Sequence, residues 1–242
     1  MRGSCIVFAI LLFAQLASSS RAHALLLSPM SASLAPSGEG ATHTFELTNQ
    51  FDRTIAVQLS IGERVQSATG AESVRRDAGI SRRFVLFPAS VSLKPKEKRL
   101  VRLAWRGEPH LDHELNFRLI AEQLPISGER KGDEAERRAA VNLLMKYIAA
   151  VYITPPESKS NVEILNVARA GAKMRIRIRN SGRRHQILRR FHLQWDGGSL
   201  DPEQPRELAG QNILAGQERD FEFAWPKSAQ PTAKNYRLVV AP

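Results

Sequence analysis

The chain has almost no cysteine. Among its 242 residues there is one, Cys5, and it lies in an N-terminal segment with the pattern of a secretory signal peptide. Without that segment the chain has no thiol, which excludes a disulfide, a cysteine nucleophile and a cysteine-based zinc site. The absence of cysteine is compatible with export into an oxidising compartment.

The N-terminal segment has the three parts of a signal peptide. Arg2 gives a positive start, residues 6–17 form an apolar run that is short for a bilayer span, and residues 22–24 (AHA) form a small-x-small cleavage site. We expect residues 1–24 to be removed and Leu25 to become the N-terminus, with an uncleaved anchor as the alternative. No later run predicts a membrane span, so stable membrane insertion is not expected.

Sequence signatures of catalysis are also missing. There is no Gly-x-Ser-x-Gly elbow, phosphate loop or dinucleotide fingerprint. Residues 110–114 (HLDHE) place two histidines beside two carboxylates, but no further ligand follows at a recognised spacing, and a solvated turn is the preferred interpretation. His185 follows a turn and is interpreted as a structural imidazole that contacts backbone. The sequence therefore predicts no enzyme, no metal site and no cofactor.

Acidic residues are outnumbered by basic ones. Lys and Arg number 35 against 24 Asp and Glu, for a formal net charge of +11, and removing Arg2 and Arg21 with the signal peptide leaves +9. Such an excess favours anionic partners. The basic residues are dispersed among acidic ones, however, and no RNA-binding signature, helix-turn-helix pattern or zinc finger is present. A nucleic-acid partner is not expected.

The chain does contain many short segments with the alternation of β-strands. They recur at roughly ten-residue spacing with Gly, Pro and Asn between them, which is typical of antiparallel sandwiches. The first part of the chain has candidates at 42–48, 54–62, 84–87, 91–93, 99–105, 115–124 and 141–153. The second part has candidates at 162–168, 173–179, 187–195, 206–213, 221–225 and 236–240.

A linker separates these two parts. Residues 155–160 (PPESKS) begin with a double proline that ends a strand, and the polar run after it has little to bury. The sequence predicts an all-β fold with domains at 25–155 and 161–242, joined by a linker at 156–160. Residues 128–138 (GERKGDEAERR) form a charged loop, and a helical turn over 133–140 remains open.

Residues 141–155 (VNLLMKYIAAVYITP) are the most informative segment. One face of this predicted strand is apolar throughout, and the other carries Leu144, Ile148 and Tyr152 besides polar residues. Such a strand is buried between layers, or something else covers it. At a sheet edge it would be a template for the strand of another chain. The continuous apolar face consists of Val141, Leu143, Met145, Tyr147, Ala149, Val151 and Ile153.

A series of motifs resembles the first domain of periplasmic pilus-assembly chaperones. The motifs are Phe87-Pro88, 91–95 (VSLKP), 99–103 (RLVRL), 117–119 (FRL) and 122–125 (EQLP). Residues 144–155 resemble the G strand of the archaic branch of that family. Residues 180–182 (NSG) with His185, and residues 213–216 (ILAG), resemble turns in the second domain of that branch. The order and spacing of these motifs are specific, and they span nearly the whole mature chain.

The resemblance implies two immunoglobulin-like domains in an L-shaped arrangement. It also implies a periplasmic chaperone that donates its G strand to pilus or fimbrial subunits lacking one strand, and that delivers them to an outer-membrane usher. Val141, Leu143 and Met145 would fill the groove of the subunit, with Tyr147 at the junction. Leu25 and Leu27 of the first strand would clamp the other edge. The alternative is that these residues only pack in the core of the chaperone itself.

One part of the family pattern is missing. Classical members hold the C-terminal carboxylate of the subunit with an Arg in the first strand and a Lys in the G strand. Here Ser31 or a neighbour stands in the region of the Arg, and Ala149 or Ala150 stands in the region of the Lys. The remaining candidate anchors are Lys146, Arg102 and Arg118, and backbone amides are a further option.

Two other functions remain open from the sequence. An immunoglobulin-like structural or adhesive module of the cell surface would share the fold without strand donation. An exported enzyme with a shallow site would need a cluster of polar groups that the linear sequence does not reveal.

Overall fold

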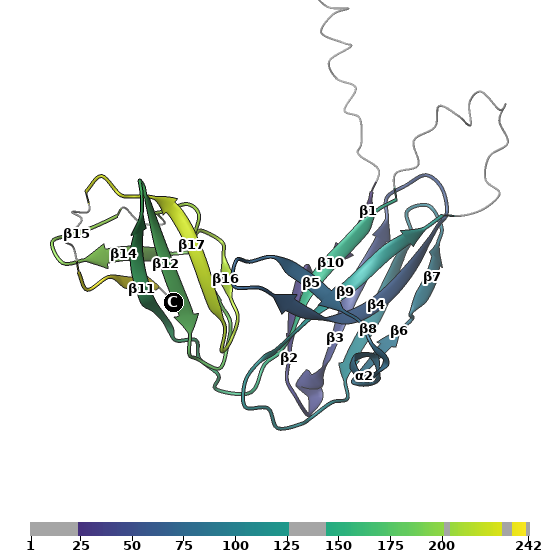
Figure 1. The fold of residues 1–242 in the computed structure, drawn as a ribbon. Helices are drawn as coiled ribbons and strands as arrows, with labels where there is room; N and C mark the ends of the chain where they lie inside the picture. The colour runs from purple at the N-terminus through teal and green to yellow at the C-terminus, as the bar shows by residue number, and fades with distance from the viewer. Residues whose placement is uncertain (1–23, 126–143, 201–203, 229–233, 241–242) are drawn as a thin grey trace, which may run out of the picture.

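The computed structural model describes residues 24–125, 144–200, 204–228 and 234–240, almost all of them in short strands and the turns between them. Figure 1 shows two β-rich bodies set at an angle, with the chain passing from one to the other after β10 (Lys146–Ile153). Each body has its own apolar core, and the two cores share no residue. The predicted all-β, two-domain, L-shaped fold is confirmed. The proposed boundaries at 155 and 161 remain a prediction.

The first domain is a sandwich of two sheets. One sheet has the strand order β1 (Leu25–Ser28), β3 (Thr42–Asn49), β8 (Lys98–Trp105), β6 (Phe84–Phe87). The other has the order β2 (Ser31–Leu34), β10, β9 (Leu115–Leu124), β4 (Ile55–Gln66), β5 (Glu72–Arg75), and β7 (Ser90–Leu93) also pairs with β4.

The core of this sandwich forms from alternate residues of facing strands. Phe45 of β3 and Phe117 of β9 are fully buried, and each stands in an alternating stretch of its strand. The ring of Phe84 meets the rings of Trp105 and Phe117 edge-on, at centroid distances of 5.0 and 4.9 Å. Such edge-to-face contacts are the preferred arrangement of aromatic pairs. The period-two pattern in the sequence therefore identifies the inner faces correctly.

The N-terminal segment divides between the two sheets. Leu25–Ser28 pairs antiparallel with β3, whereas Ser31–Leu34 pairs in parallel with β10 in the opposite sheet. Pro29 lies between them and has no N–H to give to either ladder. The sequence predicts one first strand here, and the structure has two short ones. This segment therefore lies along the edge of the sandwich, next to β10.

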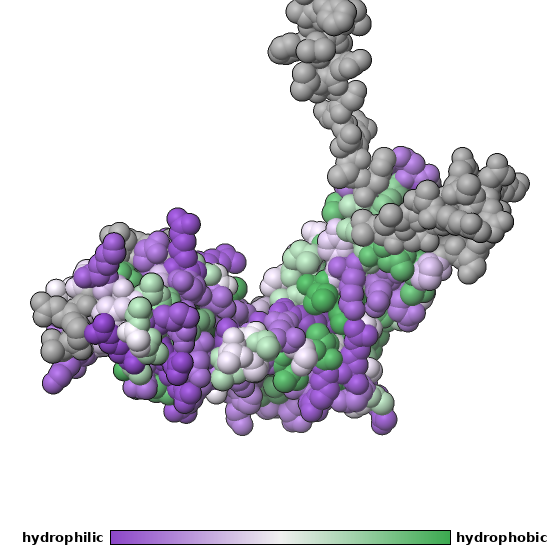
Figure 2. Space-filling view, turned by 45° about the horizontal axis from the view of Figure 1, so that its top comes forward, coloured by the Kyte–Doolittle hydropathy of each residue, from purple (hydrophilic) through white to green (hydrophobic). Residues whose placement is uncertain are grey.

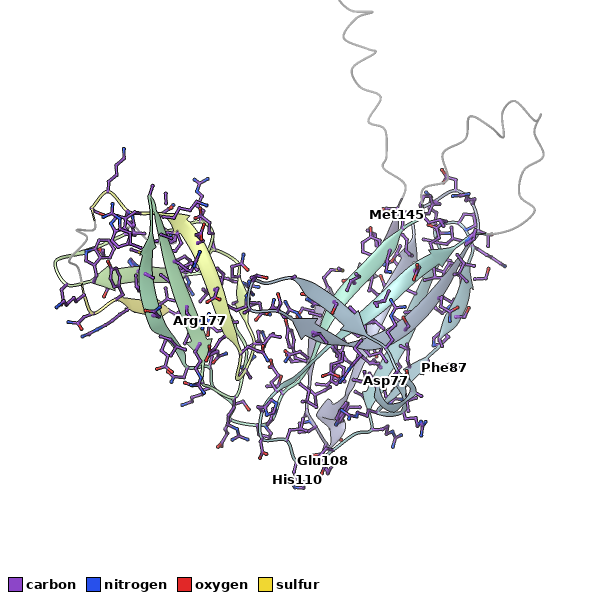
Figure 3. The ribbon with its side chains drawn as sticks, in the orientation of Figure 1. Asp77, Phe87, Glu108, His110, Met145 and Arg177 are labelled. Carbon is purple, nitrogen blue, oxygen red and sulfur yellow. The ribbon has the colours of Figure 1, made fainter. Side chains whose placement is uncertain are left out.

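The second domain is smaller. One of its sheets has the strand order β11 (Val162–Ala170), β12 (Lys173–Asn180), β17 (Glu218–Ala224). Another has the order β15 (Gly198–Ser199), β14 (Phe191–Trp195), β18 (Arg237–Val240). A two-stranded ladder joins β13 (Gln186–Ile187) to β16 (Asn212–Ile213). On β12, the alternate residues Met174, Ile176 and Ile178 are buried. Arg177, which lies between the last two and is labelled in Figure 3, binds both oxygens of Asp220 at 2.7 and 2.9 Å.

Two predicted strands of the second domain are wrong in extent. The prediction at 187–195 divides into β13 and β14. The prediction at 206–213 is mostly a turn, because Leu208 N and Ala209 N donate to Pro205 O and Arg206 O at 3.0 Å each. Gly210 has a φ of +72°, which fits a turn and not a strand. Leu208 is nevertheless fully buried, so its apolar character reflects the core without being part of a strand.

Three elements of the first domain have no counterpart among the sequence predictions: the 3-10 helix η1 (Glu39–Ala41), the strand β5 and the helix α2 (Ala78–Arg82). The strand β5 pairs with the last residues of β4, and β4 runs to Gln66, beyond its predicted end at residue 62. The short helix α2 begins at Asp77, whose side chain accepts a hydrogen bond from Ile80 N at 2.8 Å. Within the described ranges, no helix is long and apolar enough to cross a membrane. Residues 1–23 of the predicted signal peptide and the predicted loop at 128–138 lie outside the described residues.

Candidate functional site

The strand β10 is paired along its whole length on one side and along half of its length on the other. It runs antiparallel to β9 over Lys146–Ile153, whereas β2 reaches only Ala150 to Ile153. In the part of the chain that the structure describes, no strand pairs with the other side of residues 146–149. Ala150 N donates to Met30 O at 2.9 Å on the β2 side. By the alternation of a strand, the N–H and C=O groups of Lys146 and Ile148 face this same open side.

The two faces of β10 differ in burial. Ala149, Val151 and Ile153 are fully buried in the core of the first domain. Met145 and Tyr147 continue the same face toward the start of the strand, where they are half-buried and pack against the edge of that core. The opposite face exposes Leu144 and Ile148, the latter by 42%. Figure 3 marks Met145 at the far end of the first domain, and Figure 2 shows apolar residues gathered over this domain, whereas the visible face of the second is mostly hydrophilic.

The other predicted groove-filling residues are placed as follows. Val141 and Leu143 lie outside the described residues, so their role stays a prediction. Leu25 and Leu27 of β1 are buried in the first domain's own core, and the exposed side chains of that strand are Leu26, at 37%, and Ser28. Because Leu25 and Leu27 point inward, the outer edge of β1 presents main-chain groups and the exposed side chains, and the clamp role of this strand stays a prediction.

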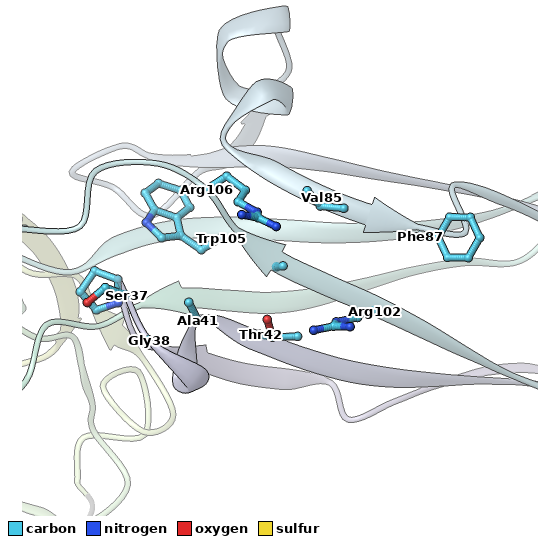
Figure 4. A pocket seen from close by; sticks show the side chains of 11 residues that line it. Ser37, Gly38, Ala41, Thr42, Val85, Phe87, Arg102, Trp105 and Arg106 are labelled. Atoms are coloured by element: carbon cyan, nitrogen blue, oxygen red, sulfur yellow. The ribbon is translucent and has the colours of Figure 1, made fainter.

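The three candidate anchors are not brought together. Lys146 is at the start of β10, 3.8 Å from Glu122. Arg102 is on β8, in the other sheet, where it lines a hollow of about 540 Å³ beside Val85 and Phe87 (Figure 4). Arg118 is on β9, within the sheet that contains β10.

Arg118 lies near the region in which the sequence predicts the classical basic pair to be missing. Ala150 is in register with Ser31 of β2 on one side and with Arg118 of β9 on the other. In-register residues of neighbouring strands project from the same face of a sheet. Arg118 is therefore one strand away from Ala150, one of the two residues that the sequence places in the region of the classical Lys.

Arg118 shares a carboxylate with a second arginine. Its Nε and Nη2 donate to Glu72 at 2.6 and 2.9 Å, and Arg64 Nε donates to the same carboxylate at 2.8 Å. Burial lowers the pKa of Arg64, as does the charge of Arg118, while Glu72 raises it. Burial raises the pKa of Glu72, but the two guanidinium groups outweigh this and hold it below its ordinary value. Arg64 and Glu72 were missed from the sequence, because only the register of three strands brings them to Arg118.

Glu114 joins the two domains. Its side chain is fully buried; Oε2 accepts a hydrogen bond from Thr154 Oγ1 at 2.9 Å, and Oε1 accepts one from the backbone N of His185 at 3.2 Å. The Nδ1 atom of His185 is 2.6 Å from the same Oε1. The ring of Tyr152 stacks on the His185 ring with centroids 4.0 Å apart, and Asn212 Nδ2 donates to the Tyr152 hydroxyl at 2.9 Å.

This junction changes the interpretation of two sequence motifs. The imidazole of His185 contacts a carboxylate of the first domain, and not backbone as predicted. In the segment 110–114, Glu114 points into the domain junction, while His110 is exposed (Figure 3). Among the described residues, no group of three or more His, Cys, Asp or Glu side chains is placed to hold a metal ion.

A second contact joins the domains at a distance from Glu114. Figure 1 shows the hairpin of β4 and β5 extending toward the second domain. Asp220 N of β17 donates to Ala68 O in the turn of this hairpin at 2.9 Å. A Cβ atom on Gly70 of the same turn would lie 2.3 Å from Arg219 Nη2, so the Arg219 guanidinium packs directly over the turn.

Similar folds occur among solved chaperone structures. The class 5 fimbriae chaperone CfaA is 15% identical, with a TM-score of 0.58 over 90% of this chain and all of the other. The CsuC–CsuE chaperone–tip subunit complex from the archaic chaperone–usher Csu pili of Acinetobacter baumannii is 12% identical, with a TM-score of 0.55 over 82% of this chain and 89% of the other. The SafB chaperone structure with SafA pilin from Salmonella enterica gives 13% and 0.53, covering 92% and 99%. At these identities the likeness establishes the fold.

The family follows from the sequence match. No curated protein matches the chain significantly by sequence. Residues 31–159 match the model of the family described as "Pili and flagellar-assembly chaperone, PapD N-terminal domain". This match covers more than half of the chain and includes β2 to β10, with the open edge and the Arg118 cluster. The chain belongs to the family of pilus and flagellar-assembly chaperones.

Proposed function

We propose that this protein is a periplasmic chaperone that binds pilus or fimbrial subunits by donating the first half of β10 and the residues before it. The subunits, whose sandwich lacks one strand, would then be delivered to an outer-membrane usher. The observation that carries the proposal is the open edge at residues 146–149, next to a strand face that continues the core.

The open edge provides main-chain affinity. A subunit strand placed beside β10 would pair with the N–H and C=O groups of Lys146 and Ile148, as in other cases of strand addition. Each such hydrogen bond contributes about 1 kcal/mol net. Because main-chain groups are the same in every sequence, this part of the binding suits different subunits of one fibre.

Apolar side chains provide the rest. Val141, Leu143 and Met145 stand at every second position, so in a continuing strand they would share one face and enter the subunit's groove. Burying one such side chain fully contributes about 1.5–3 kcal/mol. Binding and release therefore require no nucleotide and no catalytic group, in agreement with a non-enzymatic family.

Among the three candidate anchors, Arg118 is the best placed for the subunit's terminal carboxylate. It is in register with Ala150, at the inner end of the open edge. Arg64 and Arg118 share one carboxylate, so this cluster retains positive charge for an incoming anion. Lys146 is half-exposed beside Glu122, and Arg102 is on the opposite sheet, which makes both weaker candidates.

Capture of a subunit from the periplasm tests the proposal. The chaperone is co-expressed with a small secreted subunit encoded beside its gene, and the complex is purified through a tag on the chaperone. We expect Leu143→Asp to abolish the complex, because a charge would have to enter an apolar groove. Leu165→Asp is the control, because Leu165 is an exposed leucine on β11 of the second domain.

Both variants should keep the circular dichroism and melting temperature of the parent. Retention of the subunit by a folded Leu143→Asp chaperone would refute strand donation. A chaperone that captures no subunit at all would favour the alternative, an immunoglobulin-like structural or adhesive module.

A further inference from the structure

One stretch of the chain departs from the general dispersion of its charges. Residues 164–195 contain nine Lys and Arg residues and no Asp or Glu. The neighbouring strand β17 neutralises part of this stretch, because Arg175 pairs with Glu222 and Arg177 binds Asp220. Beyond β12 the stretch continues in β13, which pairs with β16, and both residues of β16 are uncharged. The basic residues around β13 are therefore not neutralised across the ladder.

Three cations near β13 have no carboxylate partner among the residues that the structure describes. They are Arg184 and Arg189, which stand on either side of β13, and Lys159 of the linker, and all three are exposed. Arg183, by contrast, donates to main-chain oxygens in the loop before β9. A single exposed cation is ordinarily just solvated. What these three can do therefore depends on how they are arranged.

The three side chains line one hollow of about 510 Å³. Linker residues 158–160 form part of its wall and residues between 184 and 190 form the rest, so no residue of the first domain lines it. Within the described part of the chain, no Asp or Glu lines it either. His185 is also in the wall, but its Nδ1 atom already contacts Glu114 Oε1 at 2.6 Å. Small-molecule sites typically measure about 300–1,000 Å³, so this hollow has the size of one.

The backbone that carries these cations is anchored. Leu188, between the two arginines, is fully buried; its N donates to Gln211 O at 2.9 Å, and its O accepts from Gly210 N at 2.8 Å. On the linker side, Lys159 O accepts a hydrogen bond from Arg183 N at 2.8 Å. The fold itself therefore holds like charges around one hollow. Such an arrangement focuses a positive potential and attracts anions.

The number and type of donors favour a phosphate group over a singly charged anion. Each guanidinium has five N–H donors in a planar fork, and the lysine ammonium has three. A phosphate monoester offers three acceptor oxygens and a charge of about −1.5 to −2 at neutral pH, which suits three cations at once. Guanidinium groups also bind phosphate through two parallel hydrogen bonds, which adds geometric selectivity.

We propose that this hollow binds a phosphate group through Arg184, Arg189 and Lys159. The site is separate from the open edge of β10, which belongs to the first domain, and it does not depend on strand donation. Two sources present the same group: a free or small-molecule phosphate, and the headgroup of an anionic lipid. In the second case the protein would be attracted to a membrane surface without inserting into it. Inorganic phosphate carries the shared group and is the first probe.

Nuclear magnetic resonance of the full chain tests the site without any substitution. The Nε–Hε resonances of the arginines are followed while inorganic phosphate replaces chloride at constant ionic strength. We expect saturable shifts for Arg184 and Arg189. Arg177 is the internal control, since it already binds both oxygens of Asp220. Absence of a saturable shift at Arg184 and Arg189, or an equal shift at Arg177, overturns the proposal.

A pair of double variants gives the second test. Arg184→Gln with Arg189→Gln removes two of the three cations, and Arg82→Gln with Arg83→Gln is the control, because it removes the same charge from two exposed arginines of the first domain. Calorimetric titration should show phosphate binding the first variant about tenfold more weakly or worse, because charge-assisted hydrogen bonds are lost. The control should bind phosphate like the parent. Equal losses in both variants, or none in the first, contradict the proposal.

Thermal denaturation separates this loss from misfolding. Because Arg184 and Arg189 have no carboxylate partner among the described residues, their double variant should melt at the temperature of the parent or above it. Weaker phosphate binding by a variant of unchanged melting temperature supports the site. Weaker binding only in a variant that melts well below the parent counts against it, because the arginines would then be structural.

Vesicles distinguish the two sources of phosphate. One set contains phosphatidylglycerol and phosphatidylcholine, and the other contains phosphatidylcholine alone. If lipid headgroups occupy the hollow, the parent floats with the first set only, and the double variant Arg184→Gln with Arg189→Gln stays in solution. If the parent floats with neither set while phosphate still shifts Arg184 and Arg189, the ligand is a small phosphate. Equal flotation of the parent and this variant with the first set overturns the lipid source.

Discussion

Replacement of Glu114 by Ala should separate the two domains energetically. The Glu114 carboxylate is fully buried and accepts hydrogen bonds from Thr154 Oγ1 and His185 N, with His185 Nδ1 at 2.6 Å. The first donor lies at the end of the first domain, and the other two belong to the second. Alanine leaves all three without an acceptor. The backbone bond from Glu114 N to Arg183 O, 2.9 Å long, is kept.

The magnitude follows from the kind of contact that is lost. Removing one partner from a buried, hydrogen-bonded charged group typically costs about 3–5 kcal/mol. Three separate hydrogen bonds to a charged group, at about 1.5–3 kcal/mol each, would sum to more, but water enters the space that the side chain leaves. We therefore expect a loss near 3 kcal/mol, and it should fall on the coupling between domains, because each core remains intact.

Calorimetry and small-angle scattering measure this. The parent should unfold in one coupled transition, and Glu114→Ala should show two, with a larger radius of gyration before unfolding. Glu114→Gln keeps the shape and one acceptor oxygen and should lie between. Glu108→Ala is the control, because Glu108 is exposed near the same loop (Figure 3). A single transition at the parent's temperature in Glu114→Ala would show that this carboxylate does not hold the domains together.

Three further predictions follow from other contacts. Gly70→Ala should lower the free energy of unfolding by about 1–2 kcal/mol because of its φ of +93°, and by more because the Arg219 guanidinium packs over the turn. Gly38→Ala, where φ is +73° and nothing lies within 4 Å of the added Cβ, is the control that measures the backbone cost alone in thermal denaturation. Glu72→Gln should lose less stability than the parent when the pH falls. Burial raises the pKa of the Glu72 carboxyl, but two arginines lower it by more, so the folded pKa lies below the ordinary value. In the parent this carboxylate therefore stabilises the fold above about pH 4.5 and stops doing so as the pH falls through the folded pKa, which urea unfolding at several pH values measures. Ile148→Pro should keep the fold and lose subunit capture, because the N–H of Ile148 faces the open side of β10. Tyr147→Pro should instead lower the free energy of unfolding by about 1–3 kcal/mol, because the N–H of Tyr147 belongs to the ladder with β9. Equal stability of the two variants would contradict the assigned edge.

The strands that the sequence identifies well are those whose burial alternates. The pattern of β12, with buried Met174, Ile176 and Ile178 between exposed basic residues, is visible in the letters 173–179 alone. The same holds for the inner face of β10. These predictions succeed because a side chain's burial in a sheet depends on its parity along the strand, which is a local property.

The polar part of the candidate site could not be found in this way. Arg64, Glu72 and Arg118 meet because β4 pairs with both β5 and β9. No spacing along the chain encodes such a meeting. A dispersed set of arginines in a basic protein therefore looked like solvated surface.

The absence of the classical basic pair, by contrast, is visible in the sequence. It leaves Lys146, Arg102 and Arg118 as candidate anchors, and the anchoring role of each stays a prediction. Only strand register distinguishes them, since Arg118 stands beside Ala150 while Arg102 belongs to the opposite sheet.

The hairpin of β4 and β5 has a mechanical consequence. The covalent linker alone would act as a hinge, about which the second domain could swing and twist. The contact between Ala68 and β17 adds a second point of attachment at a distance from the linker, so the hairpin restricts both motions. The length of the hairpin then sets the angle between the domains. Lengthening or shortening it by two residues should therefore widen or narrow this angle in discrete steps, while leaving the donated strand unchanged.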